Sequence, residues 1–292
     1  MAKPALNSKL RIRDLNSVAD LERVLLLEKE VWKCSDADIT PLALAVATLH
    51  AGSIWLGGFD GENLIGFVFA FPSLLQPARP SNSAPYQVGF HSHMLAVREP
   101  YRDAGVGYEL KLAQRQKALG LGITEMTWTF DPLRSRNAHL NFSKLGVVSS
   151  SYRVDFYGSA TTSPLDANGT DRLWVTWRMS DKRIEERLRG KAVQSEVLDA
   201  LTHVPPLVRF NGNGVPVEGD LSQALRRQRI AIEIPGDIER IEREDRELAR
   251  RWRLTTRRAF TESLGHGFVV TEFCRSIRGQ QGPGAYLLER EP

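Results

Sequence analysis

The 292-residue chain has little cysteine and no long apolar run. Its two cysteines, Cys34 and Cys274, are too few and too far apart for a disulfide framework or a cysteine-rich zinc site. A reducing cytosol is therefore the simplest compartment. No apolar stretch is long enough to cross a bilayer, and the N-terminal segment lacks the apolar core and cleavage site of a signal peptide. We expect a cytoplasmic protein without a membrane span.

Several motifs of catalytic chemistry are absent as well. Apart from His91 and His93, the histidines stand singly in the sequence: His50, His139, His203 and His266. None belongs to an HExxH or paired-cysteine pattern, so no metal is expected. No Gly-x-Ser-x-Gly elbow occurs, which leaves serine-hydrolase chemistry without a signal. The net charge of +4 suits an anionic ligand but does not separate coenzyme A from nucleic acid.

The first two thirds of the chain alternate between helical and strand periodicity. Residues 17–33 have helical spacing after a serine that can cap the first turn, and a second helix is expected at 41–50. Strands at 53–59 and 64–71 flank an Asp-Gly turn and predict a hairpin. The later elements expected up to residue 189 are strands at 88–97, 124–130, 151–157 and 172–179, and helices at 105–119, 135–145 and 181–189. This order predicts an α/β (α+β) fold with a mixed central sheet flanked by helices.

The last third of the chain differs from the first two thirds in its sequence pattern. Two consecutive prolines at 205–206 and the Asn-Gly-Asn-Gly turn at 211–214 indicate a domain border, so we expect domains at 1–190 and 191–292. The C-terminal region should contain a strand, a long helix and a strand, at 229–234, 237–264 and 268–273. It is either a lid or a degenerate second copy of the first domain. Within the first domain, four prolines between residues 72 and 85 predict a loop that could border a substrate entrance.

The segment from Gly89 to Tyr108 carries the chemistry. It reads as a strand that runs into a glycine turn and then a helix, with the pattern Arg102-x-x-Gly105-x-Gly107 at the junction. Glycines there let backbone amides approach phosphate oxygens without an intervening side chain. The helix start adds unpaired N–H groups and a positive dipole end. These features suit a pyrophosphate, although a simple tight turn is the structural alternative.

With Leu-Ala-Val before the turn and a helix and a strand after it, this segment resembles the acyl-CoA motif of the Gcn5-related N-acetyltransferase (GNAT) superfamily. The resemblance extends over roughly residues 10–180 and implies a GNAT-type sheet with acetyl-CoA or another acyl-CoA as cosubstrate. It implies that loop amides bind the pyrophosphate and that the edge of the preceding strand pairs with pantetheine. The cofactor-binding residues that it implies are Leu95, Ala96, Val97, Arg102, Asp103, Ala104, Gly105, Val106, Gly107 and Tyr108.

The two histidines make the resemblance to a known pattern more specific. The run from His91 to Val97 is similar to the arylalkylamine N-acetyltransferase pattern, in which two histidines one residue apart deprotonate the acceptor directly or through water. In a regular strand His91, His93, Leu95 and Val97 would share one face. Histidine titrates near neutral pH and suits the removal of a proton from an amine. The structural alternative is a pair of hydrogen-bonded core histidines.

The strand and helix that follow add further candidates. Asp131, at a strand tip, could orient a histidine, bind the acceptor's ammonium or cap the next turn. Residues 137–146 resemble the superfamily's late helix beside pantetheine, which implies contacts from Asn137, Asn141 and Lys144. Phe142 stands where many relatives carry a tyrosine that protonates the departing thiolate. The general acid is therefore unassigned: either a thiolate leaves unaided, or a substitute acts from among Tyr101, Tyr152 and Tyr157.

The expected function is direct acyl transfer from acyl-CoA to a primary amine of a small molecule or amino acid. Acetyl is the default acyl group, and succinyl is the alternative given the excess of arginine. The arginine-rich helix at 237–264 interleaves acids with its bases, as a solvated face does, so nucleic acid is not an expected partner. The rival class is a non-catalytic protein that senses acyl-CoA or binds nucleic acid on the same fold. A homodimer is left open.

Overall fold

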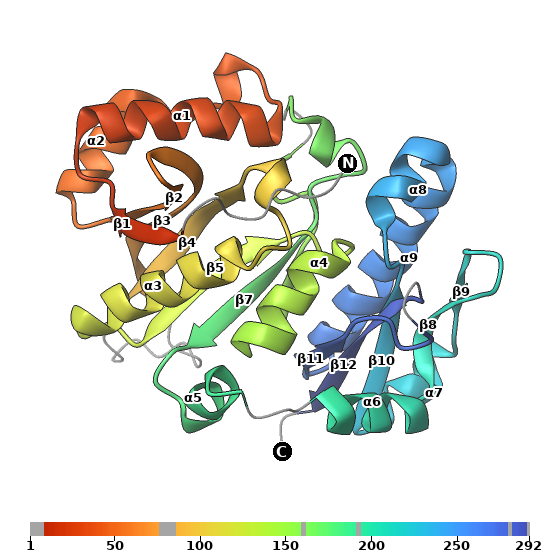
Figure 1. The fold of residues 1–292 in the computed structure, drawn as a ribbon. Helices are drawn as coiled ribbons and strands as arrows, with labels where there is room; N and C mark the ends of the chain where they lie inside the picture. Colours follow the sequence, from red (N-terminus) through yellow and green to blue (C-terminus); the bar gives the residue numbers. More distant parts are fainter. Residues whose placement is uncertain (1–8, 76–85, 159–161, 191–193, 280–281, 291–292) are drawn as a thin grey trace. The chain divides into compact units, whose positions relative to one another are not determined.

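The computed structural model describes residues 9–75, 86–158, 162–190, 194–279 and 282–290. Contacts divide the chain into two compact units. Unit 1 comprises Met1–Trp128 and Thr161–Asp166, and unit 2 comprises Thr129–Ala160 and Ala167–Pro292. The expected class is confirmed, since each unit is a β-sheet with flanking helices (Figure 1). The units part at residue 128, so the predicted domains 1–190 and 191–292 remain a sequence-level proposal.

Unit 1 is built on four antiparallel strands, with β5 added in parallel. Its elements are β1 (Arg11–Asp14), α1 (Val18–Trp32), η1 (Asp36–Asp38), α2 (Leu42–His50), β2 (Ile54–Asp60), β3 (Asn63–Leu75), β4 (Gln87–Val97), η2 (Glu99–Tyr101), α3 (Val106–Gly120), the start of β5 (Glu125–Phe130) and η4 (Pro164–Asp166). The strand order is β1-β2-β3-β4-β5. Of the predicted proline-rich loop, the first residues extend β3, and 76–85 lie outside the described residues.

The predicted N-terminal helices and hairpin are confirmed. Ser17 caps α1 by accepting a hydrogen bond from the amide of Asp20, and the apolar stripe of α1 is buried. Leu21 and Val24 from that stripe pack with Trp55 and Phe67 of the sheet. Burial of each such side chain contributes about 1.5–3 kcal/mol. This core covers one face of the sheet, and α3 packs on the other face (Figure 1).

A β-bulge interrupts β4. Phe69 of β3 pairs with Met94 and the next residue pairs with Ser92, so His93 is an extra residue in β4. After the bulge the alternation shifts: Met94 joins the core under α1, whereas Leu95 lies beside Gly107 of α3. The predicted common face of the histidines with Leu95 and Val97 is therefore wrong. An inserted residue re-aims every side chain that follows it.

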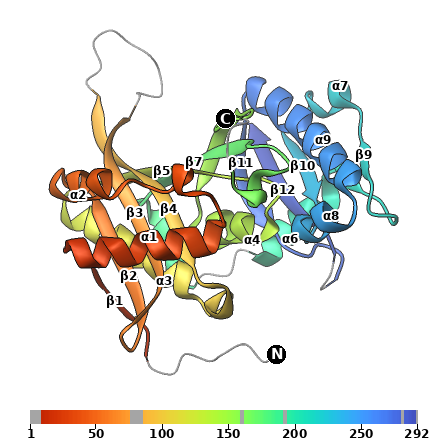
Figure 2. The same cartoon turned by 90° about the horizontal axis from the view of Figure 1, so that it is seen from above.

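Unit 2 holds seven further strands. Its elements are the end of β5, α4 (Ser135–Ala138), the π-helix η3 (His139–Leu145), β6 (Val148–Arg153), β7 (Arg172–Arg178), α5 (Lys182–Leu188), α6 (Gln194–His203), β8 (Pro206–Phe210), β9 (Pro216–Glu218), α7 (Leu221–Ala224), β10 (Arg229–Ile234), α8 (Ile238–Glu244), α9 (Arg246–Gly265), β11 (Phe268–Cys274) and β12 (Gly284–Arg290). The strands follow the order β7-β6-β11-β12-β10-β8-β9, and α9 packs against β8, β10 and β11 (Figure 2).

The C-terminal strands repeat a topology found earlier in the chain. In β10, α9, β11 and β12, the last strand inserts between the first two and runs antiparallel to both. The elements β5, α4, β6 and β7 follow the same path, with β7 between β5 and β6. This likeness supports the degenerate-copy alternative for the C-terminal region. Among the described residues, no helix is both long and apolar enough to span a membrane.

Candidate active site

The glycine turn between β4 and α3 has the geometry of an anion site. Gly105 is the N-cap of α3 with φ of 84°, and an added Cβ would meet no described heavy atom within 4 Å. A positive φ favours glycine, because other side chains are strained there. The first amides of α3, from Val106 onward, have no acceptor inside the helix and lie at its positive end. The turn can therefore receive a phosphate group.

The other predicted loop residues differ in exposure. Asp103, Ala104 and Gly105 are exposed, whereas Val106 is buried beneath the helix start. Gly107 and Tyr108 are half-buried, as is Arg102. The Arg102 side chain donates through Nε to the carbonyl of Val97 at 3.3 Å. This contact ties the loop to the end of β4.

The strand β4 pairs with a neighbour on both of its edges at Phe90 and His91. Within the described part of unit 1, β5 pairs with β4 at two positions, Phe90 with Met126 and His91 with Thr127. On its other side β4 stays paired with β3 as far as Val97. The predicted residues Leu95, Ala96 and Val97 therefore lie beyond the positions at which β4 pairs with β5 within unit 1. An extended chain can hydrogen-bond such a strand edge.

Both predicted histidines lie close to the last pair of β4 with β5 in unit 1. Their ring centroids are 6.3 Å apart, and both flank Phe71, at 5.4 Å for His91 and 5.9 Å for His93. His91 is 8% exposed and its Nδ1 lies 3.0 Å from Thr127 Oγ1, whereas His93 at the bulge is exposed. Burial, followed by the charges of His93 and Lys111, lowers the pKa of His91 to about 4. Desolvation also lowers the pKa of His93, so both rings are neutral bases near pH 7.

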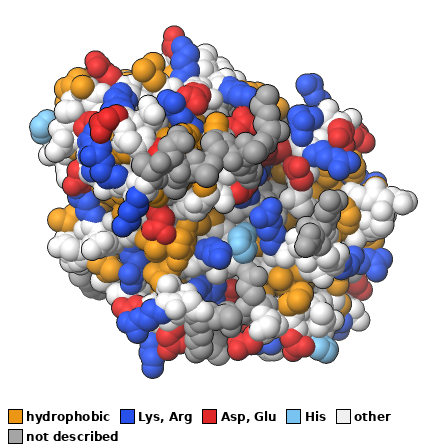
Figure 3. All heavy atoms as spheres, in the orientation of Figure 1, with side chains coloured by type: hydrophobic (Ala, Val, Ile, Leu, Met, Phe, Trp, Pro, Cys, Tyr) orange, Lys and Arg blue, Asp and Glu red, His pale blue; other side chains and the backbone are white. Residues whose placement is uncertain are grey.

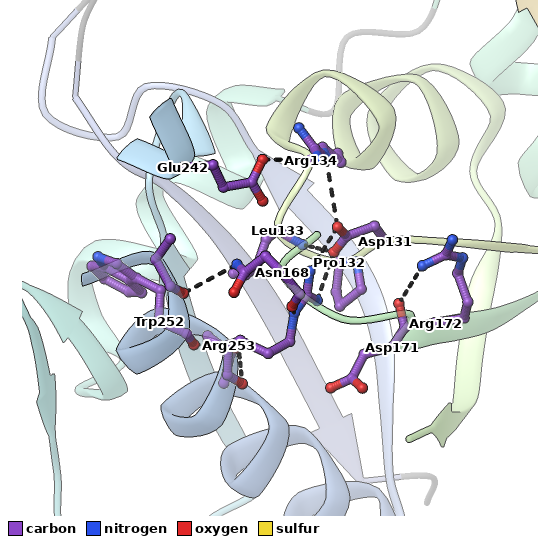
Figure 4. A network of polar contacts seen from close by, with 12 residues as sticks. Asp131, Pro132, Leu133, Arg134, Asn168, Asp171, Arg172, Glu242, Trp252 and Arg253 are labelled. Carbon is purple, nitrogen blue, oxygen red and sulfur yellow. Dashed lines mark hydrogen bonds and ion pairs between the residues drawn. The ribbon is translucent and has the colours of Figure 1, made fainter. Parts of the chain in front are cut away.

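Asp131 lies in unit 2, where it belongs to a buried ion network (Figure 4). Its carboxylate accepts two hydrogen bonds from Arg253, at 2.8 and 2.7 Å, and one from the amide of Leu133 at 2.9 Å. Burial alone would raise the pKa of Asp131, but the charges of Arg253 and Arg134 outweigh it and lower the pKa to about 2. The turn-capping alternative is thus present in the structure. A catalytic role of Asp131 stays a prediction.

The predicted coenzyme contacts on the late helix of unit 2 differ in their exposure. Asn137 and Lys144 are exposed, whereas Asn141 is buried. Phe142 is a core residue, with its ring edge-on to Tyr286 at 5.7 Å. The π-helical winding of His139–Leu145, which the sequence did not predict, sets these directions. Only Asn137 and Lys144 therefore present their side chains to solvent.

The three tyrosines considered as general acids differ in their hydrogen bonds and in their exposure. Tyr152 donates to Asp171 at 2.6 Å and is held in the interior of unit 2. Tyr101, in unit 1, donates to Asp60 at 3.4 Å. Tyr157, in unit 2, is exposed and lies 3.4 Å from Thr129 Oγ1. Tyr152 is thereby the least suited to protonate a thiolate.

Two charged side chains are buried that the sequence did not predict to be buried. Lys111 is buried behind β4, and Arg253 is buried in unit 2. The arginine-rich helix was interpreted as solvated, yet Arg257 pairs with Asp171 as Arg253 does with Asp131. Basic and acidic side chains intermingle on the face drawn in Figure 3. Among the residues described, no group of three or more His, Cys, Asp or Glu side chains is arranged to hold a metal ion.

Comparisons with known proteins find likeness in structure alone. No family model matches the chain, and no curated protein matches it. The ribosomal-protein-S18-alanine N-acetyltransferase from Escherichia coli is 13% identical, with 59% of this chain and 95% of that chain covered and a TM-score of 0.45. NAA60 of Arabidopsis thaliana in complex with acetyl-CoA is 17% identical over 58% of this chain and 99% of its own, with a TM-score of 0.45. An acetyltransferase of the GNAT family from Streptococcus pneumoniae is 16% identical over 57% of this chain and 98% of its own, with a TM-score of 0.43. At these scores we take no residue role from them.

Proposed function

We propose that the chain is an acyl-CoA-dependent N-acyltransferase of the GNAT superfamily that acts on a primary amine of a small molecule or amino acid. One observation carries the proposal. In unit 1 the strand β4 pairs with β5 up to His91, bears two imidazoles whose pKa values are lowered by burial, and is followed through η2 by a helix that begins at an unobstructed glycine. A base, a strand edge and an anion site are thus arranged along fifteen residues, from His91 to Gly105.

Each part of this arrangement has a task in direct transfer. Amides at the start of α3 hold the pyrophosphate, and the β4 edge from Leu95 to Val97 pairs with the pantetheine arm. His91 or His93 accepts the proton of the incoming ammonium, and the amine nitrogen attacks the thioester carbonyl. A backbone amide of β4 stabilises the developing oxyanion. The C–N bond forms, the C–S bond breaks, and coenzyme A leaves as a thiolate, which needs little acid assistance because thiols are acidic.

The finer assignments are part of the same proposal. We take acetyl as the acyl group and keep succinyl as the alternative. Asn137, Asn141 and Lys144 stay predicted contacts of the coenzyme. A cytoplasmic location and a homodimer are proposed on sequence grounds alone.

The proposal is tested by thiol release. The purified full-length protein is mixed with acetyl-CoA or succinyl-CoA and a library of amines and amino acids, and free thiol is measured with and without each amine. We expect release that depends on the amine and yields the matching amide by mass spectrometry. Coenzyme binding without release from any amine would favour the acyl-CoA sensor, the rival to which Phe142 in place of a tyrosine lends support.

The coenzyme site predicts a charge-reversal effect at Gly105. Gly105→Glu should weaken binding of coenzyme A about 100-fold, because the carboxylate meets the phosphates and like charges in contact cost several kcal/mol. Isothermal calorimetry measures the change. Gly122→Glu is the matched control: Gly122 follows the same helix, has φ of 77° and is equally unobstructed. Equal affinity of the two variants would contradict the site.

A further inference from the structure

A buried lysine lies directly behind the proposed base. Lys111 of α3 is 2% exposed, and its Nζ donates to Ser92 Oγ at 3.0 Å and to Gln114 Oε1 at 2.8 Å. The same Nζ lies 3.8 Å from the ring centre of Trp128. Ser92 Oγ donates in turn to Gln114 Oε1 at 3.0 Å. The hydroxyl, the amide oxygen and the indole face surround the ammonium with neutral polar groups.

The position of Ser92 gives this cluster its significance. Ser92 stands between His91 and His93 and points toward α3, on the side of the sheet opposite Phe71. It is the last residue of β4 before the bulge, and His91 is the last that pairs with β5. Thr127 of β5 contacts His91, and Lys111 holds the next residue from behind. The strand β4 is therefore held on both sides of the sheet at the point where it bulges.

We propose that Lys111 is a positioning residue for the two histidines, because through Ser92 it fixes the bulge that presents them. Its amino group is bonded to the residue that stands between the histidines, so the proposal also has an electrostatic part. The inference rests on the proposed function and assigns to it a residue that never touches the substrate. No other element is needed to fasten Ser92, because both of its partners come from consecutive turns of α3.

The electrostatic part follows from two bases that compete for a proton. Burial lowers the pKa of Lys111 well below its ordinary value. The groups that face His91 are His93 on its own strand, Lys111 on α3, the neutral Thr127 on β5 and the neutral Phe71 on β3. A proton on Lys111 opposes a proton on His91, so the two titrate as a coupled pair. Removing the amine should let His91 take up a proton at higher pH.

The first test does not require turnover. The ring resonances of His91 are followed by NMR against pH in the unliganded protein, the Lys111→Met variant and the Lys117→Met variant. Methionine matches the length and apolar stem of lysine and leaves Ser92 bonded to Gln114. We expect the midpoint of His91 to rise by about one pH unit in Lys111→Met. Lys117→Met removes an equal charge from the partly exposed end of the same helix and should leave it unchanged. An unchanged midpoint in both variants overturns the electrostatic part.

The second test separates positioning from charge. Ser92→Ala retains Lys111 and its bond to Gln114 but releases β4. We expect kcat to fall about tenfold in Ser92→Ala and in Lys111→Met, with the KM for acyl-CoA within twofold, and the acid limb of kcat/KM to move to higher pH in Lys111→Met alone. Wild-type kcat in Ser92→Ala overturns the positioning part. Absence of turnover in the wild type refutes the proposed function, and the NMR titration then still decides the assignment of Lys111.

Discussion

Replacing both His91 and His93 with alanine should lower kcat/KM about a hundred- to ten-thousand-fold, the usual contribution of a general base. Both rings contact Phe71 beside the last pair of β4 with β5 in unit 1, and no third imidazole of unit 1 is near them in sequence. Coenzyme affinity should stay within a few-fold, because the anion site begins beyond the end of β4. Steady-state kinetics and calorimetry measure the two quantities. His50→Ala, at the exposed end of α2, is the control.

The pH profile of the single variants identifies which ring is the base. A general base works only when neutral, so kcat/KM falls as the pH drops through its pKa in the free enzyme. For His91, with a pKa of about 4, the rate should hold until the pH approaches that value. For His93, whose pKa is lowered by desolvation, the limb lies below the ordinary 6.5. The single variant that still carries the histidine acting as the base should show the same acid limb of kcat/KM as the wild type. Unaltered turnover of the double variant would contradict the base assignment altogether.

Local signals explain why the first half of the fold was predictable. α1 combines a serine cap with a periodic apolar stripe, and the hairpin turns at Gly61, whose φ is 59°. The glycine at the start of α3 has the positive φ that its position requires. Such features depend on a few neighbouring residues, so the sequence alone indicates them.

The parts that sequence reasoning missed depend on distant partners. The bulge at His93 exists only in relation to the register of β3, and strand alternation carries no mark of an inserted residue. The sequence indicated a solvated helix because acids alternate with the arginines in its first half, although the second half is more purely basic. In the structure Arg253 and Arg257 pair with Asp131 and Asp171, about a hundred residues earlier. β8 was missed because it begins at Pro206, which predicted a turn.

The ion pair of Arg253 with Asp131 yields the largest expected effect on stability. Arg253 is 2% exposed and binds the carboxylate through two nitrogens, so Arg253→Met removes both of these charge-assisted hydrogen bonds and leaves the buried carboxylate with Arg134 and the Leu133 amide. We expect the free energy of unfolding to fall by about 3–5 kcal/mol. Urea denaturation followed by circular dichroism measures the change. Arg251→Met, at an exposed position of α9, is the control and should alter stability by less than about 0.5 kcal/mol.

The acid dependence of stability has a definite sign. Because the pKa of Asp131 is lowered to about 2, its contribution is complete above the ordinary value of 3.8 and is lost as the pH falls through about 2. In Arg253→Met this loss between pH 4 and 2 should disappear. Equal midpoints for the two methionine variants would show that the pair contributes nothing.

The same pair offers a test of the two interpretations of the C-terminal region, which both stay predictions. Arg253 lies within residues 191–292, whereas Asp131 lies within the predicted first domain. A lid hinged near residue 190 would have to break this buried pair each time it opened, at a cost of about 3–5 kcal/mol. The hydrogen bond that the Tyr286 hydroxyl donates to the carbonyl of Pro132, at 2.6 Å, would be lost as well. A permanently docked, degenerate copy incurs neither cost. An Arg253→Met variant that only loosened residues 191–292, without destabilising β5 and the Asp131 that follows it, would favour the lid.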